Sequence, residues 1–374
     1  MIPRRPGQPT LLIHDGSPGL GGSITSVGAL APFLGRAGWR VEVAAFQPDG
    51  WAQERIAPHL LPGQGDRITG AGYFAREVLR ARDLARLCRQ LRPDVLLANN
   101  GPAANLSTHL AGWTLHLPVL QYVRGPFWES EVSARALRAA AGVFTVGDEC
   151  SRQVVKVSGV APEQVEEGLD PSRWPTMRRA GARGFLWNSS LVAWKGLPLL
   201  LEAYGSMGVP SPGLEVCYAP FPPGHPEAIV PPSKLPAGVT AHPAPPDLDA
   251  IRARSLVYLH TAQRPEPFGR SLLEAMAAGL CPIVPEAGTP GRLVRNGENG
   301  LTYSPGSLEG LRRAMRIAAS DPELCERLGA RAEAEARAYR SELVFQPILQ
   351  ALERLHPART VPDLPGPLEV AHGR

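Results

Sequence analysis

The chain has 374 residues, of which 44% are hydrophobic and 20% are charged, and its formal net charge is +4. This composition is typical of a globular protein and excludes a disordered one. Because no run of basic residues occurs, we expect no nucleic-acid partner. The length exceeds what one ordinary hydrophobic core accommodates, so it predicts two domains.

The cysteines and the apolar segments bear on the compartment. The five cysteines are far apart and form no CxxC pair, so they indicate neither a metal site nor a disulfide framework and fit a reducing compartment. The first apolar run, LLI at 11–13, is too short for a signal peptide, and no window of about 20 apolar residues predicts a transmembrane helix. We therefore expect a cytoplasmic protein.

Short β-like runs alternate with longer helical segments along the chain. The runs of the first half are TLLIHD, VEVAAF, DVLLAN, PVLQYV and VFTVG, separated by segments such as AREVLRARDLARLCRQL. A polar stretch at 170–184 interrupts the alternation, which resumes with GFLWNSS, LEVCYA, SLVYLHT and CPIVPEA. Residues 210–246 are rich in proline and predict loops with short strands. This alternation is typical of βαβ units and predicts two doubly wound α/β domains.

The last helical segment is RSELVFQPILQALERL at 340–355. We expect one helix there, bent at Pro347, because proline disrupts the helical hydrogen bonding around it. Its apolar residues fall on one stripe that we expect to be buried: Leu343, Val344, Ile348, Leu349, Leu352 and Leu355. The proline-rich tail that follows is expected to be loose.

Functional residues are expected in the loops after the strands, since parallel sheets bind ligands outside the carboxyl ends of their strands. After the first predicted strand, glycines occur at Gly16, Gly19, Gly21 and Gly22. They do not form a dinucleotide fingerprint, because Ile24 stands where the third glycine belongs, and no Walker lysine follows. Glycines that open a helix still let the backbone approach an anion or a sugar closely. The alternative is a flexible strand-to-helix turn.

A lysine stands in the loop after the first strand of the second half. Lys195 and Gly196 precede a helical segment, where a cation could face a bound phosphate. The alternative is a solvated surface lysine. Because the chain has only three lysines, Lys156, Lys195 and Lys234, we favour the functional interpretation.

Two aspartates, Asp247 and Asp249, form a DLD sequence like the metal-binding pair of another class of sugar-transferring enzymes. They precede the segment AIRARSLVYLH, so we expect Asp247 to cap a short helix instead. The sequence therefore predicts no metal site.

Two glutamates flank a short apolar helix in EPFGRSLLEAMAAG, residues 266–279. If the helix begins near Arg270, its N-terminus favours an anion such as a phosphate. Glu274 lies four residues further, about 6 Å along the axis, and a carboxylate can accept both hydroxyls of a ribose diol. Glu266 would face whatever lies beyond the phosphates, so the pair predicts a nucleotide-sugar. The alternative is two structural glutamates paired with arginines such as Arg264 or Arg292.

This stretch, with CPIVPEAGTPGRLVRNGENGLTY after it, resembles the signature of glycosyltransferase family 4, retaining enzymes of the GT-B fold. Glu266 and Glu274 match the E-x7-E motif of that family. Residues 21–22 match its N-terminal Gly-Gly loop, 165–174 its segment before the linker, and 195–196 its phosphate-binding Lys-Gly. The resemblance covers nearly the whole chain.

The resemblance implies a role for each matching residue. Glu266 and Lys195 would be catalytic, with Glu266 at the transferred sugar and Lys195 at the diphosphate. Glu274 would hold the ribose, and the backbone around Phe268 and Gly269 would hold the phosphates.

The resemblance also places residues on the acceptor side of the donor. Gly22 would border both the donor phosphate and the acceptor, while Gly21 and Asp15 would belong to the acceptor-side loop.

Three departures from the family pattern change the expected site. Ser190 stands where the family usually has an arginine, so the charged phosphate contact would come from elsewhere, such as Arg270. We expect both Ser190 and Arg270 to be donor-binding residues. Arg124 stands where a histidine is common, and we expect it to be catalytic. Residues 167–170 read EGLD in place of N-G-V-D.

The resemblance implies a GT-B protein of two Rossmann-like domains facing across a cleft. We expect an acceptor domain at 1–172, a nucleotide-sugar donor domain at 184–340, a helix at 341–356 that packs back on the first domain, and a tail at 357–374.

The expected activity is transfer of a sugar from a nucleoside-diphosphate sugar to an unidentified carbohydrate or lipid-linked acceptor, with retention of configuration, in glycan or glycolipid assembly. No cofactor and no metal are expected, and a lipid-linked acceptor leaves a peripheral membrane contact open. One alternative is a nucleotide-sugar epimerase on the same fold. Another is a degenerate member that binds nucleotide or sugar without catalysis, which Ser190 and Arg124 would support.

Overall fold

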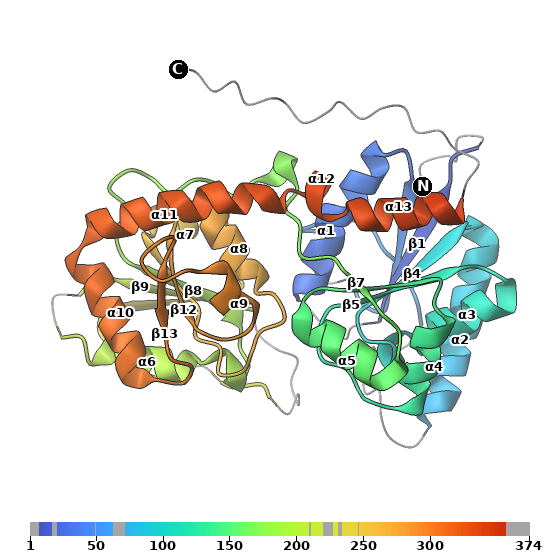
Figure 1. The fold of residues 1–374 in the computed structure, drawn as a ribbon, viewed down its shortest axis with the longest axis horizontal. Helices are drawn as coiled ribbons and strands as arrows, with labels where there is room; N and C mark the ends of the chain where they lie inside the picture. The colour runs from blue at the N-terminus through green and yellow to red at the C-terminus, as the bar shows by residue number, and fades with distance from the viewer. Residues whose placement is uncertain are drawn as a thin grey trace.

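The computed structural model describes residues 7–16, 21–48, 50–62, 72–208, 211–219, 227–230, 234–245 and 247–356. It contains two parallel β-sheets, one in each half of the chain, with helices packed around them (Figure 1). Every strand pair within the two sheets is parallel, as the alternation of strands and helices predicts.

The first sheet has seven strands in the order β3-β2-β1-β4-β5-β6-β7. Its strands are β1 (Thr10–Asp15), β2 (Arg40–Ala45), β3 (His59–Leu60), β4 (Val95–Asn99), β5 (Val119–Val123), β6 (Gly142–Thr145) and β7 (Glu163–Gln164). Its helices are α1 (Gly22–Arg36), α2 (Tyr73–Leu91), α3 (Leu106–Leu115), α4 (Glu131–Ala139) and α5 (Asp148–Ser158). Every residue of β1, β4 and β5 is buried, which is why these strands read as nearly continuous apolar runs.

The second sheet has six strands in the order β10-β9-β8-β11-β12-β13. Its strands are β8 (Phe185–Ser190), β9 (Leu214–Ala219), β10 (Val239–Pro243), β11 (Val257–Leu259), β12 (Cys281–Pro285) and β13 (Leu301–Tyr303). Its helices are α6 (Leu197–Gly205), α7 (Leu248–Arg254), α8 (Arg270–Ala277), α9 (Gly288–Leu293), α10 (Leu308–Ser320) and α11 (Pro322–Ala336). Single-turn 3-10 helices occur at Ala103–Asn105 (η1), Pro171–Arg173 (η2), Ala193–Lys195 (η3) and Arg337–Tyr339 (η4).

The end of the described chain differs from the single bent helix that we predicted. It forms two helices, α12 (Ser341–Val344) and α13 (Gln346–Leu355), and Pro347 lies in the first turn of α13. Proline is tolerated there because the N–H groups of a first turn have no partner within the helix. The predicted stripe is wrong at Leu343, which is 58% exposed, whereas Phe345 between the two helices is fully buried.

Both terminal helices lie against the first half of the molecule (Figure 1). The ring of Phe345 lies 6.2 Å from that of Phe33 in α1, and the ring of His356 lies 6.0 Å from that of Trp39. The backbone of Leu169 bonds to Tyr339 and Ser341 at the entry to α12. The residue limits that we expect for the domains stay predictions. The tail at 357–374 lies outside the described residues.

In the part of the chain that the structure describes, no helix combines the length and the apolar character that crossing a membrane requires.

Phe345→Ala should lower the free energy of unfolding by about 3–5 kcal/mol, because it opens a cavity in a closely packed core. Leu343→Ala, two residues earlier on an exposed surface, is the matched control and should change it by less than about 0.5 kcal/mol. Chemical denaturation of the three proteins measures both effects. Equal losses would show that Phe345 does not anchor the terminal helices.

Candidate functional site

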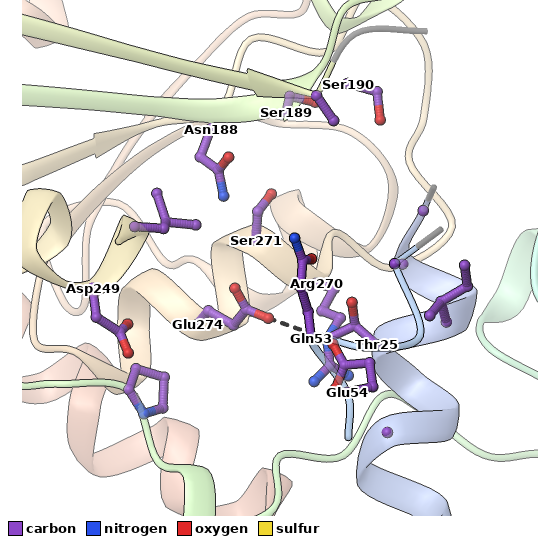
Figure 2. Close-up of a pocket in the computed structure, with 18 of the residues that line it drawn as sticks. Thr25, Gln53, Glu54, Asn188, Ser189, Ser190, Asp249, Arg270, Ser271 and Glu274 are labelled. Atoms are coloured by element: carbon purple, nitrogen blue, oxygen red, sulfur yellow. Dashed lines mark hydrogen bonds and ion pairs between the residues drawn. The ribbon is translucent and has the colours of Figure 1, made fainter. Parts of the chain in front are cut away.

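A cleft of about 610 Å³ lies between the two halves of the molecule, and residues of both halves line it. The first half contributes Gly21, the early turns of α1, and Gly50, Gln53 and Glu54. The second half contributes the ends of β8 and β9 and parts of α7 and α8 (Figure 2). The cleft therefore lies at the carboxyl ends of parallel strands, as predicted.

Glu274 projects from α8 into this cleft (Figure 2). The helix begins at Arg270, as predicted, and Gly269 precedes it with a φ of 92°, a conformation that favours glycine. Oε1 of Glu274 accepts a hydrogen bond from Nε of Arg270 at 3.1 Å, and Oε2 accepts one from Nη2 of Arg252 at 3.0 Å. Two guanidinium groups thus balance this partly buried carboxylate.

Neither arginine that we had considered as a partner of the two glutamates contacts them. Arg264 pairs with Glu227 at 2.7 Å, and Arg292 pairs with Glu166. The alternative that the two glutamates pair with Arg264 or Arg292 is therefore wrong. Glu274 does pair with other arginines.

Arg270 links Glu274 to the first half of the molecule. Its Nη1 donates to Oε2 of Glu167 at 3.3 Å and to the carbonyl oxygen of Gly168 at 3.2 Å. The other oxygen of Glu167 accepts from Nη1 of Arg124 at 3.0 Å. A continuous series of ion pairs thus joins the two halves, formed by Arg252, Glu274, Arg270, Glu167 and Arg124.

Arg124 and Asp15, which we predicted for the site, do not line the cleft. The side chain of Arg124 is 4% exposed, lies 3.9 Å from the Tyr122 ring centroid, and donates to Ser26 and Asn99. Asp15 is 1% exposed and accepts from the side-chain amides of Asn99 and Asn100. Both are buried and hydrogen-bonded to residues of the first half, and their catalytic and acceptor roles stay predictions.

Lys195 and Glu266 meet at the cleft and form an ion pair. Nε2 of His260 lies 3.0 Å from the other oxygen of Glu266 but off the line of a hydrogen bond. Burial alone would raise the pKa of Glu266, but the Lys195 ammonium and His260 outweigh it and hold that pKa well below its usual range. Glu266 is therefore an ionised carboxylate next to a cation.

The backbone after Lys195 requires glycine. Gly196 has a φ of 76°, and a Cβ there would lie 1.9 Å from the carbonyl oxygen of Thr261. The hydroxyl of Thr261 donates to the carbonyl oxygen of Lys195 at 2.8 Å. These contacts fix the turn that aims Lys195 at Glu266.

The remaining predicted residues divide between the cleft and the core. Ser190, Gly21 and Gly22 line the cleft. Phe268 is 3% exposed, packs against Tyr339 with ring centroids 5.9 Å apart, and does not line the cleft. Gly269 at the start of α8 is not part of the lining either. Gly19 lies outside the described residues.

The helix cap that we predicted in place of a metal site is confirmed. Oδ1 of Asp247 accepts a hydrogen bond from the backbone N–H of Ala250 at 2.8 Å, and Asp249 pairs with Arg252. Within the described ranges, no group of three or more histidine, cysteine, aspartate or glutamate side chains is placed to hold a metal ion.

The residues at or next to the cleft that were not predicted from the sequence include four ionisable ones: Arg252, Glu167, His260 and Glu54. Glu54 lines the cleft and pairs with Arg173 at 2.7 Å. Burial raises the pKa of Glu54, and Arg173 offsets only part of that shift. A cleft-lining glutamate without a motif around it carries no signal that sequence spacing could reveal.

Two family models match the chain. Residues 20–173 match the model described as Glycosyltransferase Family 4, and residues 234–335 match the model described as Glycosyl transferases group 1. Among curated proteins, glycogen synthase of Mycobacterium tuberculosis is 33% identical over 91 residues, which cover 24% of this chain and 21% of that protein. The match thus spans about a fifth of that relative.

Solved structures resemble nearly the whole chain. Anabaena HepE in complex with UDP-glucose matches with a TM-score of 0.74 at 19% identity, over 92% of this chain and 99% of that one. Sucrose-phosphate synthase from Thermosynechococcus elongatus matches with a TM-score of 0.72 at 17% identity, over 94% and 100%. With the two parallel sheets, these similarities confirm the predicted GT-B fold.

Glu266→Gln should destabilise the protein most at neutral pH and progressively less as the pH falls into the acid range. A carboxylate whose pKa is lowered in the folded state contributes stability above its unfolded pKa, about 4.3 for glutamate, and loses that contribution as the pH falls. The gap between parent and variant in unfolding free energy should therefore shrink below about pH 4.3.

The matched control is Glu131→Gln, since Glu131 is also paired with arginines but its side chain is 62% exposed. It should show little difference at any pH. A gap for Glu266→Gln that is constant from pH 7 to pH 3 would contradict the assigned charge state.

Proposed function

We propose that the chain, which belongs to glycosyltransferase family 4, transfers a sugar from a nucleoside-diphosphate sugar to an acceptor with retention of configuration. The observation that carries this proposal is the arrangement of three charged groups in one cleft. Glu274 stands one helical turn into α8, whereas Glu266 stands before the helix, paired with Lys195. The matched glycogen synthase and the UDP-glucose complex of HepE support the same activity.

The donor would lie along α8 with its ribose at Glu274. Its diphosphate would then lie at the N-terminus of the helix, where backbone N–H groups and the helix dipole favour anions. Lys195 would stabilise the charge that builds on the leaving diphosphate. Ionised Glu266, close to that lysine, would lie near the positive charge that develops on the transferred sugar.

The reaction needs no nucleophile from the protein. The bond between the sugar and the diphosphate oxygen breaks, and the acceptor hydroxyl forms the new bond on the same face. Its proton passes to the leaving diphosphate oxygen. The residues of the cleft then act by positioning the substrates and by electrostatic stabilisation.

The finer assignments are proposals too. The acceptor is a carbohydrate or a lipid-linked sugar of glycan or glycolipid assembly, and a lipid-linked acceptor would bring a peripheral membrane contact. The cytoplasm is the compartment that suits the five cysteines, all of them buried and none in a disulfide. We propose transfer without a metal or a cofactor.

Nucleoside diphosphates should raise the melting temperature, because a ligand that binds only the folded state stabilises it. UDP is the first probe, with GDP and ADP as alternatives, and UDP-glucose follows in a product assay with and without acceptor sugars. Sugar transfer would support the proposal. Epimerisation without acceptor would favour the epimerase, and binding without any product would favour the degenerate member.

Glu274→Gln should weaken binding of the stabilising nucleotide by about 1–3 kcal/mol, the range for hydrogen bonds to a charged group. Glu333→Gln is the matched control, since Glu333 also pairs with an arginine four residues away but does not line the cleft. Calorimetry should show a loss in the first variant alone. Unchanged affinity in folded Glu274→Gln would remove this residue from the ribose site.

Lys195→Ala should lower the turnover number by roughly 10²–10³, because one preorganised charge at the leaving group is lost. The effect on binding of a nucleoside monophosphate should be smaller, since the charge builds mainly in the transition state. Lys195→Arg should recover little, because a guanidinium does not replace a compact ammonium.

Lys156→Ala is the matched control, since Lys156 also pairs with a glutamate but its side chain is 70% exposed. Its steady-state kinetics should equal those of the parent. Near-normal turnover in Lys195→Ala would show that another cation, such as Arg270, holds the diphosphate.

A further inference from the structure

Arg252 is a buried arginine on α7 that contacts the carboxylate proposed to hold the ribose. Its side chain is 6% exposed, and Nη2 donates to Oε2 of Glu274 at 3.0 Å. Nη1 pairs with Asp249, whose side chain is 50% exposed. One nitrogen of this guanidinium is therefore directed at Glu274, and another pairs with the half-exposed Asp249.

Its position on α7 is fixed independently of Glu274. Asp247 caps the helix, and Ile251 and Ala253 on either side of Arg252 are buried. A buried guanidinium is costly unless an anion compensates it, and its partner Glu274 lines the cleft. The cost of burying Arg252 is thus offset at the proposed donor site.

The two oxygens of Glu274 are held by different arginines. Arg270 divides its donors between Glu274 and the first half of the molecule, where it contacts Glu167 and Gly168. Arg252 bonds to Glu274 and Asp249, both in the second half. A ligand that attracts Arg270 would leave the contact from Arg252 in place.

A carboxylate oxygen has two lone-pair directions, so each oxygen of Glu274 can accept one bond from an arginine and one from a hydroxyl. We propose that Arg252 is a positioning residue for the nucleotide: it fixes the plane of the Glu274 carboxylate so that both oxygens accept the ribose hydroxyls. The proposal rests on the proposed function and adds a residue to its donor site.

The chain supplies a matched control two residues away. Arg254 lies on the same helix and also pairs with a glutamate, since its Nε donates to Oε1 of Glu215 at 2.8 Å. Its side chain is 47% exposed, and it does not line the cleft. Arg254→Gln therefore removes an arginine–glutamate pair from α7 without touching Glu274.

The experiment compares UDP with 2′-deoxy-UDP by calorimetry in the parent, Arg252→Gln and Arg254→Gln. The parent should prefer UDP by about tenfold or more, the scale of a hydrogen bond to a charged group. Arg252→Gln should lose most of that preference and bind UDP about tenfold more weakly, while Arg254→Gln should match the parent. GDP or ADP and its deoxy form replace UDP if the melting screen selects them.

A merely structural role would lower the melting temperature of Arg252→Gln and leave the ratio of the two affinities unchanged, which overturns the proposal. Arg252→Lys keeps the charge and provides a second folded variant. Its ratio should lie between those of the parent and the glutamine variant, since an ammonium holds a carboxylate less rigidly than a guanidinium fork. A full preference in either folded variant overturns the proposal.

The parent measurements separate this inference from the function on which it rests. If the parent binds no nucleoside diphosphate, both fail. If it binds but does not prefer the ribonucleotide, the role of Glu274 and this inference fail while the transferase proposal stands. If it prefers the ribonucleotide and either Arg252→Gln or Arg252→Lys keeps the full preference, only the role of Arg252 fails.

Discussion

The geometry of the cleft depends on the ion pairs that the carboxylate of Glu167 forms with two arginines. Its side chain is 7% exposed and bonds to Arg124 of the first half and Arg270 of the second. Removing one partner from a buried ion pair typically costs about 3–5 kcal/mol, because it leaves a charge without compensation. Glu167 holds two such guanidinium groups at once. It therefore fixes Arg270 relative to the first sheet, and through Arg270 it fixes Glu274.

The cations that line the described part of the cleft are already balanced by carboxylates. Lys195 faces Glu266, Arg173 faces Glu54, and Arg252 and Arg270 share Glu274. A diphosphate that enters has to compete with these carboxylates for the same donors. Affinity for a donor would then reflect an exchange of partners and not simply a gain of contacts.

The sequence predicts well those features that depend on local pattern. The buried strands appear as apolar runs. Asp247 is predicted as a helix cap, and it accepts a hydrogen bond from the N–H of Ala250, three residues later. The two-residue strands β3 and β7 are too short to carry a periodic pattern. The partners of the glutamates could not be predicted, because Glu167 and Arg270 are 103 residues apart. Arg264 is close to Glu266 in the chain and yet pairs with Glu227.

Ser190 and Arg124, two of the three departures from the family pattern, have different structural consequences. Ser190 lines the cleft and brings no charge to it, whereas the charge of Arg124 is enclosed and shared with Glu167. Arg124 therefore does not replace the missing arginine, and Arg270 is the cleft cation placed at the start of α8. To contact a diphosphate there, Arg270 would have to weaken its bonds to Glu167 and Gly168. Phosphate binding and the contact between the two halves would then both use the guanidinium of Arg270. A bound donor would therefore weaken the contact that Arg270 makes with the first half.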